Sequence, residues 1–136
     1  MKLNQTSEGI ERRGFLKLIA GLPALFYIPS SKSSQSILIL ETVLAGFIYY
    51  DAEVIWHDIK VGDSLRLRRE PHNHYDQKAI EVFWKVHKLG YVPRVDNSAI
   101  AQMMDRGLIL EAKIIWLKVD DDPWERIGMN IELVLS

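Results

Sequence analysis

Apolar and polar residues alternate along most of the chain after residue 36, and this period of two predicts β-strands. Within 63–70, Leu65 and Leu67 fall on one face while Arg66 and Arg68 fall on the other, as expected for a half-buried strand. Similar runs, rich in β-branched and aromatic residues, predict five or six short and mostly antiparallel strands, drawn from 37–50, 63–70, 78–86, 88–94, 108–119 and 125–136. In the third of these runs, Ile80, Val82 and Trp84 are predicted to point inward, and in the first, Gly46 is predicted to form a bulge or bend.

Two short segments between these runs have helical character. AEVIWHDI (52–59) predicts a short helical turn, and NSAIAQMMD (97–105) carries apolar residues at helical spacing. Asn97 or Ser98 is suited to cap the second helix, and Gly107 to end it. The predicted fold is therefore mainly β with two short helices (α+β). A small OB-like or SH3-like antiparallel β-barrel would bury such a sheet without long exposed edges.

The N-terminal region has a different pattern. ERRGFLK (11–17) precedes the charge-free run LIAGLPALFYI (18–28), and a Ser-rich stretch (30–36) follows. This order resembles a bacterial twin-arginine (Tat) export signal, and the apolar run is shorter than the roughly 20 residues that span a membrane. We therefore expect residues 1–36 to be an export signal with a linker, and residues 37–136 to be the folded domain.

This N-terminal segment implies a location. We expect an exported, periplasmic domain, or one held at the membrane through residues 12–29 if the signal stays uncleaved. An amphipathic N-terminal helix of a cytoplasmic protein is the less favoured alternative.

Composition excludes several classes of site. The chain has no cysteine, which excludes disulfides, thiolate zinc sites and a cysteine nucleophile. Residues 1–39 hold five basic and two acidic residues, so of the 17 Lys+Arg and 18 Asp+Glu in the whole chain, 12 and 16 remain beyond them, a net charge of −4. A broad basic surface for non-specific polyanion binding is therefore excluded, and any nucleic-acid site must be local.

The segment REPHNHYDQKAIEVFW (69–84) gathers the most reactive side chains of the chain. His72, His74 and Asp76 alternate, but no fourth ligand for zinc lies nearby in the sequence, so we expect no metal and no other cofactor. The sequence has neither a GxxxxGK[ST] phosphate loop nor a Gly-x-Ser-x-Gly elbow. We therefore predict a protein without catalytic residues.

Several motifs occur in an order that resembles the HIRAN domain: LAGFIYY (44–50), LRLRREPHNHYDQKAIEV (65–82), LGYVPR (89–94) and NSAIAQMMDRG (97–107). The family's loop pattern is R-[DE]-P-x-N-P-Y-D-x-x-A-[IV]-x-V, and this chain departs from it only at His74, which replaces a proline. PWERI (123–127) also resembles bacterial stand-alone members. The resemblance covers residues 40–136 and implies an OB-like barrel that grips the 3′ end of single-stranded DNA, as in DNA-repair helicases and translocases.

The resemblance also implies a set of site residues. Asp76 would accept a hydrogen bond from the terminal 3′-hydroxyl, Tyr75 would stack on a terminal base, and Arg94 would hold a phosphate. The other implied residues are aromatic: Tyr49 and Tyr50 as a stacking wall, with Tyr50 alternatively facing the core, and Tyr91 at a position that is often histidine.

One residue weakens the resemblance to DNA-gripping members. Ile48 stands where such a member has a basic residue. Together with the acidic balance, it favours an alternative function, an exported envelope domain that binds a peptide, glycan or protein and not DNA.

Overall fold

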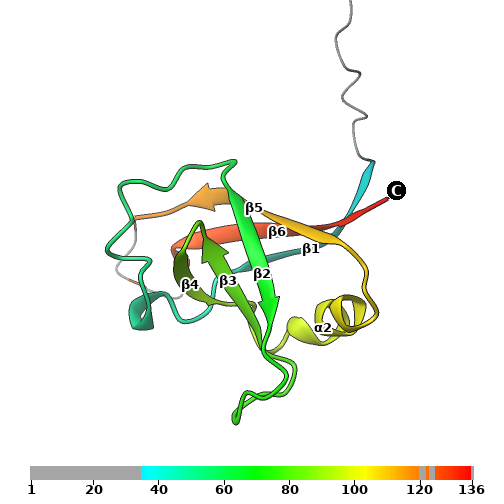
Figure 1. The fold of residues 1–136 in the computed structure, drawn as a ribbon. Coiled ribbons are helices and arrows are strands. Elements are labelled where there is room, and N and C mark those ends of the chain that lie inside the picture. The colour runs from blue at the N-terminus through cyan, green and yellow to red at the C-terminus, as the bar shows by residue number, and fades with distance from the viewer. Residues whose placement is uncertain (1–34, 120–121, 123–124, 136) are drawn as a thin grey trace, which may run out of the picture. The chain divides into compact units, whose positions relative to one another are not determined.

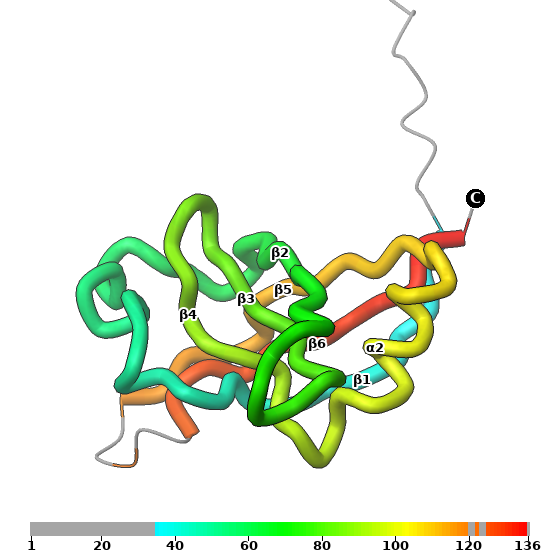
Figure 2. The backbone as a smooth tube through the Cα atoms, turned by 60° about the horizontal axis from the view of Figure 1, so that its bottom comes forward, coloured from blue at the N-terminus to red at the C-terminus, as the bar shows by residue number. Residues whose placement is uncertain are grey.

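Strand β2 (Ser64–Arg69) joins the two halves of one antiparallel sheet (Figure 1). The computed structural model describes residues 35–119, 122 and 125–135. The six strands lie in the order β1-β6-β5-β2-β3-β4. Their remaining bounds are β1 Ser36–Val43, β3 Ile80–Trp84, β4 His87–Tyr91, β5 Leu110–Leu117 and β6 Ile127–Val134. The helix α2 (Asn97–Asp105) and the turns of residues 51–58 lie at opposite ends of this curled sheet (Figures 1 and 2).

The two edges of the sheet meet just beyond β1. Ala45 forms an isolated antiparallel bridge with Tyr91 of β4, and each backbone N–H donates to the other residue's carbonyl over 2.9 Å. The approach requires a glycine at position 90, because a Cβ there would lie 2.1 Å from the Ala45 carbonyl oxygen. The sheet is therefore barrel-like, with its edges joined by one bridge rather than by a paired strand.

The inward face of the sheet forms the core as the alternation predicts. Ile80 and Val82 are fully buried, and Trp84 is 8% exposed. The outward face of β3 is buried as well, because Phe83 is 8% and Glu81 4% exposed. Strand β3 thus has neighbours on both faces, which the sequence pattern did not indicate.

The predicted fold class, mainly β with short helices, is confirmed, but two segments differ from the prediction. The predicted strand 37–50 ends at Val43, since Gly46 adopts a left-handed conformation (φ 81°) and Phe47–Tyr49 form the 3₁₀ helix η1. Phe47 is 1% exposed, so burial of this ring turns the chain inward here. Residues 51–58 form successive hydrogen-bonded turns and not a regular helix.

Helix α2 has the predicted bounds of 97–105, but its N-cap is Asp96 and not Asn97 or Ser98. The Asp96 carboxylate accepts a hydrogen bond from the Thr42 hydroxyl (2.7 Å) instead of capping the helix. Gly107, with φ 80°, follows the end of the helix as predicted.

The predicted export signal and the membrane-associated segment 12–29 lie outside the described residues, apart from the last two residues of the linker. Within the described part of the chain, no helix is long and apolar enough to cross a membrane.

Candidate nucleic-acid interface

The loop between β2 and β3 takes its shape from one asparagine. The Asn73 side-chain oxygen accepts hydrogen bonds from the backbone N–H groups of Tyr75 (2.8 Å) and Asp76 (3.0 Å). Its amide nitrogen donates to Glu70 Oε1 at 2.6 Å. Such local bonds are what asparagine supplies in turns. They fix the backbone that presents the Tyr75-Asp76 pair.

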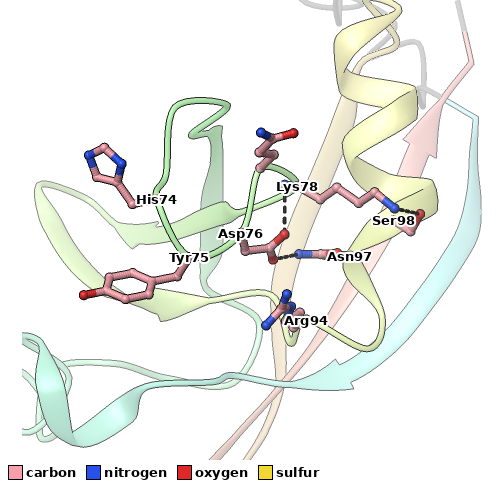
Figure 3. Close-up of a pocket in the computed structure, with 8 residues that line it drawn as sticks. His74, Tyr75, Asp76, Lys78, Arg94, Asn97 and Ser98 are labelled. Atoms are coloured by element: carbon pink, nitrogen blue, oxygen red, sulfur yellow. Dashed lines mark hydrogen bonds between the residues drawn. The ribbon is translucent and has the colours of Figure 1, made fainter.

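The Asp76 carboxylate is held from two sides (Figure 3). Its Oδ2 accepts a hydrogen bond from the Asn97 side-chain amide at 2.7 Å, and its Oδ1 accepts one from the Lys78 backbone N–H at 2.9 Å. Burial raises the pKa of Asp76, but these two hydrogen bonds and the charges of Arg94 and Lys78 outweigh it, so the pKa lies below its ordinary value. Asp76 is therefore an oriented and ionised acceptor.

Two hollows lie on either side of this carboxylate, and Tyr75, Asp76 and Arg94 line both. The α2 hollow, of about 380 Å³, also contacts Lys78 and the start of the helix at Asn97 and Ser98. The tyrosine hollow, of about 370 Å³, is further lined by Ala45, Tyr50, Asn73, Ala79, Tyr91 and Val92. Tyr75 projects from the loop with 89% of its surface exposed (Figure 3).

The structure thus brings together five of the six predicted site residues: Tyr50, Tyr75, Asp76, Tyr91 and Arg94. Tyr50 lines the tyrosine hollow and does not face the core. Tyr49 lines neither hollow; it lies in η1 and is 68% exposed.

The wall of the tyrosine hollow is fixed by Lys88. The rings of Tyr50 and Tyr91 meet edge to face with centroids 5.8 Å apart, and Lys88 Nζ lies 4.3 Å from each centroid. Lys88 also donates to the Tyr91 hydroxyl (2.8 Å), which in turn donates to Glu70 Oε2 (3.1 Å). Burial is the main reason that the pKa of Tyr91 is raised, so this phenol stays neutral and able to donate. The two rings therefore form a preset surface for a planar ligand.

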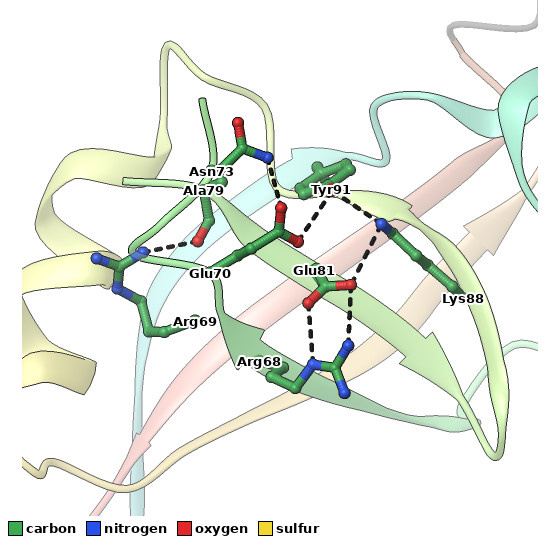
Figure 4. Close-up of polar contacts among 8 residues, drawn as sticks. All are labelled: Arg68, Arg69, Glu70, Asn73, Ala79, Glu81, Lys88 and Tyr91. Atoms are coloured by element: carbon green, nitrogen blue, oxygen red, sulfur yellow. Dashed lines mark hydrogen bonds and ion pairs between the residues drawn. The ribbon is translucent and has the colours of Figure 1, made fainter. Parts of the chain in front are cut away.

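A buried carboxylate connects this wall to β2, and the sequence analysis did not identify it (Figure 4). Glu81 accepts two hydrogen bonds from the Arg68 guanidinium (2.9 and 3.2 Å) and lies 3.2 Å from Lys88 Nζ. Burial raises the pKa of Glu81, but the hydrogen bonds and charges of Arg68 and Lys88 outweigh this effect, so the pKa lies below its ordinary value. The cations come from neighbouring strands, so only the register of β2, β3 and β4 reveals the cluster.

The remaining candidate residues lie at the surface. Ile48 is 47% exposed in η1, where it offers no charge to a phosphate. His72 and His74 are both exposed, and His74 points away from Asp76 (Figure 3). Among the described residues, no group of three or more His, Cys, Asp or Glu is placed to hold a metal ion.

Comparison with known proteins agrees with this architecture. The chain matches the HIRAN domain over residues 37–136, and a search of curated proteins found no match. A crystal structure of a protein from Lactobacillus plantarum is similar, with a TM-score of 0.64 and 28% identity over 73% of this chain and 95% of that one. The crystal structure of the HIRAN domain of human HLTF has a TM-score of 0.58 and 20% identity over 74% of this chain and 80% of its own, which supports the fold alone. Because the family match covers most of the chain, the chain belongs to the HIRAN domain family, known as a family of nucleic-acid-binding modules.

Proposed function

We propose that this HIRAN domain is a non-catalytic module that binds the 3′-hydroxyl end of single-stranded DNA. One observation carries the proposal: the ionised Asp76 carboxylate is oriented by Asn97 and Lys78, next to Arg94 and between two hollows. A fixed carboxylate accepts a hydrogen bond from a free hydroxyl and repels a terminal phosphate. This selects the chemistry of the end rather than the base sequence.

The groups around Asp76 suit the rest of a terminal nucleotide. Tyr75 is almost fully exposed on its loop, and stacking on such an aromatic contributes roughly 1–3 kcal/mol per base. Tyr50 and Tyr91 offer a second aromatic surface within the tyrosine hollow. Arg94 is exposed and has no hydrogen bond or ion pair within the described residues, which leaves its guanidinium available for a phosphate.

The same residues indicate modest affinity. Ile48 supplies no phosphate contact, and residues 40–136 carry 12 Lys+Arg against 16 Asp+Glu. Each missing phosphate contact flattens the salt dependence of single-strand binding by about 0.7 in the logarithmic slope. We therefore expect binding that is end-specific but weak, and detectable mainly at low salt.

A second candidate function follows from Ile48, the acidic balance and the N-terminal resemblance to an export signal. In this alternative, residues 1–36 direct the domain to the periplasm or hold it at the membrane. The tyrosine hollow would then receive a peptide, a glycan or an envelope protein, and DNA would not bind.

Fluorescence anisotropy distinguishes the two. The full chain would be titrated against a short labelled single strand that ends in a 3′-hydroxyl or a 3′-phosphate, at low and moderate salt. We expect at least about 10-fold tighter binding of the hydroxyl end, a difference of roughly 1.4 kcal/mol, and loss of this preference in Asp76→Ala. Equal binding of both ends would contradict the proposed end recognition. No binding of either end would favour the envelope function.

A further inference from the structure

On the outer face of the sheet, one aromatic ring packs against two arginines. Phe83 of β3 is 8% exposed because the guanidinium of Arg66 lies 4.5 Å from its ring centroid and that of Arg68 lies 4.8 Å from it. Both arginines are exposed, and they are two residues apart on the same face of β2. We call these three residues the arginine platform.

The arginine platform is continuous with the tyrosine hollow. Phe83 pairs with Arg66 on one side and with Lys88 of β4 on the other. Lys88 covers the rings of Tyr50 and Tyr91, which line the hollow. Figure 4 shows part of this path, in which hydrogen bonds and ion pairs connect Arg68 to Glu81, Glu81 to Lys88, and Lys88 to Tyr91. A ligand that leaves the hollow along the sheet therefore meets the arginine platform next.

The charges along this path favour a polyanion. Three cations, Arg66, Arg68 and Lys88, face two carboxylates. Both carboxylates already accept hydrogen bonds from neighbouring side chains, Glu81 from Arg68 and Glu70 from Asn73 and Tyr91. Arg66 has no hydrogen bond or ion pair within the described residues, and its guanidinium contacts only the ring face of Phe83. A guanidinium that packs over an aromatic ring can bind a phosphate or stack under a base.

We propose that the nucleotides preceding the 3′ end run from the tyrosine hollow over Lys88 onto the arginine platform. This inference rests on the proposed end recognition and extends it, because it assigns the direction of the bound strand and a site longer than the terminal nucleotide. The spacing of Arg66 and Arg68 along β2, about 6.6 Å at 3.3 Å per residue, lets them contact successive parts of one extended backbone.

A strand that left Asp76 in the opposite direction, along α2, would meet a different cation. Beyond the α2 hollow, a further hollow along the helix is lined by Lys78 and by Arg106, an exposed residue at the C-cap of α2. A strand that ran this way would contact Arg106 and leave the arginine platform empty. Arg106→Gln is therefore the matched control for Arg66→Gln, since each removes one exposed guanidinium on a different side of Asp76.

The test measures the affinity of the full chain for a 3′-hydroxyl dinucleotide and octanucleotide of thymidine, by anisotropy at several salt concentrations. We expect the octanucleotide to bind more tightly, and Arg66→Gln to weaken it about 3- to 10-fold and reduce its salt slope by about 0.7. The dinucleotide should bind Arg66→Gln as it binds the wild type. Arg66→Lys should restore the salt slope.

Other outcomes separate this inference from the end recognition itself. If the wild type binds the two lengths equally, or if Arg106→Gln and not Arg66→Gln weakens the octanucleotide, the arginine platform is not the path, while end recognition stands. If the octanucleotide binds regardless of its 3′ end and Arg66→Gln weakens it, the platform binds DNA and the end recognition is wrong. A chain that binds neither length overturns both.

Discussion

The Asn97 side-chain amide donates a 2.7 Å hydrogen bond to the Asp76 carboxylate, and so connects the first turn of α2 to a loop 21 residues earlier in the chain. Asn97 is itself 2% exposed, so its position is fixed by the core and not by solvent. A helix that packs against the end of the sheet thereby determines the direction of the one carboxylate that both hollows share. Precise support of this kind is what a recognition group requires.

Removing the Asn97 amide should change the pKa and the orientation of the Asp76 carboxylate while the domain stays folded. In Asn97→Ala, the carboxylate loses one of its two hydrogen bonds, so its pKa should rise towards the ordinary value of about 3.9. The preference for a 3′-hydroxyl over a 3′-phosphate should decline with it. NMR titration of the Asp76 carboxyl carbon measures the first effect, and anisotropy the second. An unchanged pKa in the folded variant would show that Asn97 does not orient the carboxylate.

Tyr75 offers a test of binding with little effect on stability. Its side chain is 89% exposed, so Tyr75→Ala should leave the free energy of unfolding in urea within about 0.5 kcal/mol of the wild type. Loss of a stacked ring should nevertheless weaken binding of the single strand by roughly 1–3 kcal/mol. Val54→Ala is the matched control, because Val54 is 82% exposed, lines neither hollow and is not a candidate site residue. Equal losses in the two variants would argue against a specific role for Tyr75.

Closure of the sheet depends on the absence of a side chain at position 90. A Cβ in Gly90→Ala would lie 2.1 Å from the Ala45 carbonyl oxygen, so the bridge must open. We expect a loss of at least about 2 kcal/mol in the free energy of unfolding, measured with urea. In Gly62→Ala, which has φ 93° but nothing within 4 Å of the added Cβ, strain alone should cost about 1 kcal/mol. A smaller loss at position 90 than at position 62 would contradict the close approach.

The buried carboxylate should make stability depend on acid pH. Glu81 has a lowered pKa when folded, so the unfolded chain binds more protons as the pH falls through the ordinary carboxyl range near about 4. The stabilisation is therefore fully present above that range and is lost as the pH falls through the folded pKa. Glu81→Gln should cost about 2 kcal/mol at pH 7.

The same substitution should cost less at pH 3, because this carboxyl is protonated in the unfolded wild-type chain below the ordinary range, and part of the stabilisation is then lost. Urea unfolding across this range measures both values. Glu53→Gln, which changes an exposed carboxylate in the turns after η1, should keep the wild-type pH dependence. An equal cost of Glu81→Gln at both pH values would mean that the charge of Glu81 does not contribute.

The fold was largely predictable because β-strands with one buried face repeat every second residue. Ile80, Val82 and Trp84 follow this rule and are buried as predicted. The rule fails where backbone geometry overrides side-chain pattern, as at Gly46, whose left-handed conformation ends an apolar run that still looks like a strand. The start of α2 was also not predictable from local pattern. The Asp96 carboxylate accepts a hydrogen bond from a hydroxyl 54 residues earlier and does not cap the helix that it precedes.

The loop of the candidate site was predictable for a different reason. Asn73, Tyr75 and Asp76 belong to a short local motif, and the bonds that shape it span only two or three residues. Asn97 and Glu81 could not be assigned a role in this way. Their partners lie 21 residues away for Asn97, and on separate strands for Glu81, so their roles depend on the strand register and on the packing of α2.

Tyr91 belongs both to the bridge that joins the sheet edges, through its backbone, and to the wall of the tyrosine hollow, through its ring. We call the Ala45–Tyr91 bridge the seam of the sheet. If the seam opens, Tyr91 moves away from Tyr50, so the tyrosine hollow exists only when the seam is closed. A ligand that occupies it must therefore hold the seam shut by mass action. Solvent exchange of the Ala45 and Tyr91 amide hydrogens reports opening of the seam. The rate of this exchange should therefore fall as the occupancy of the hollow rises, whatever the chemical nature of the ligand.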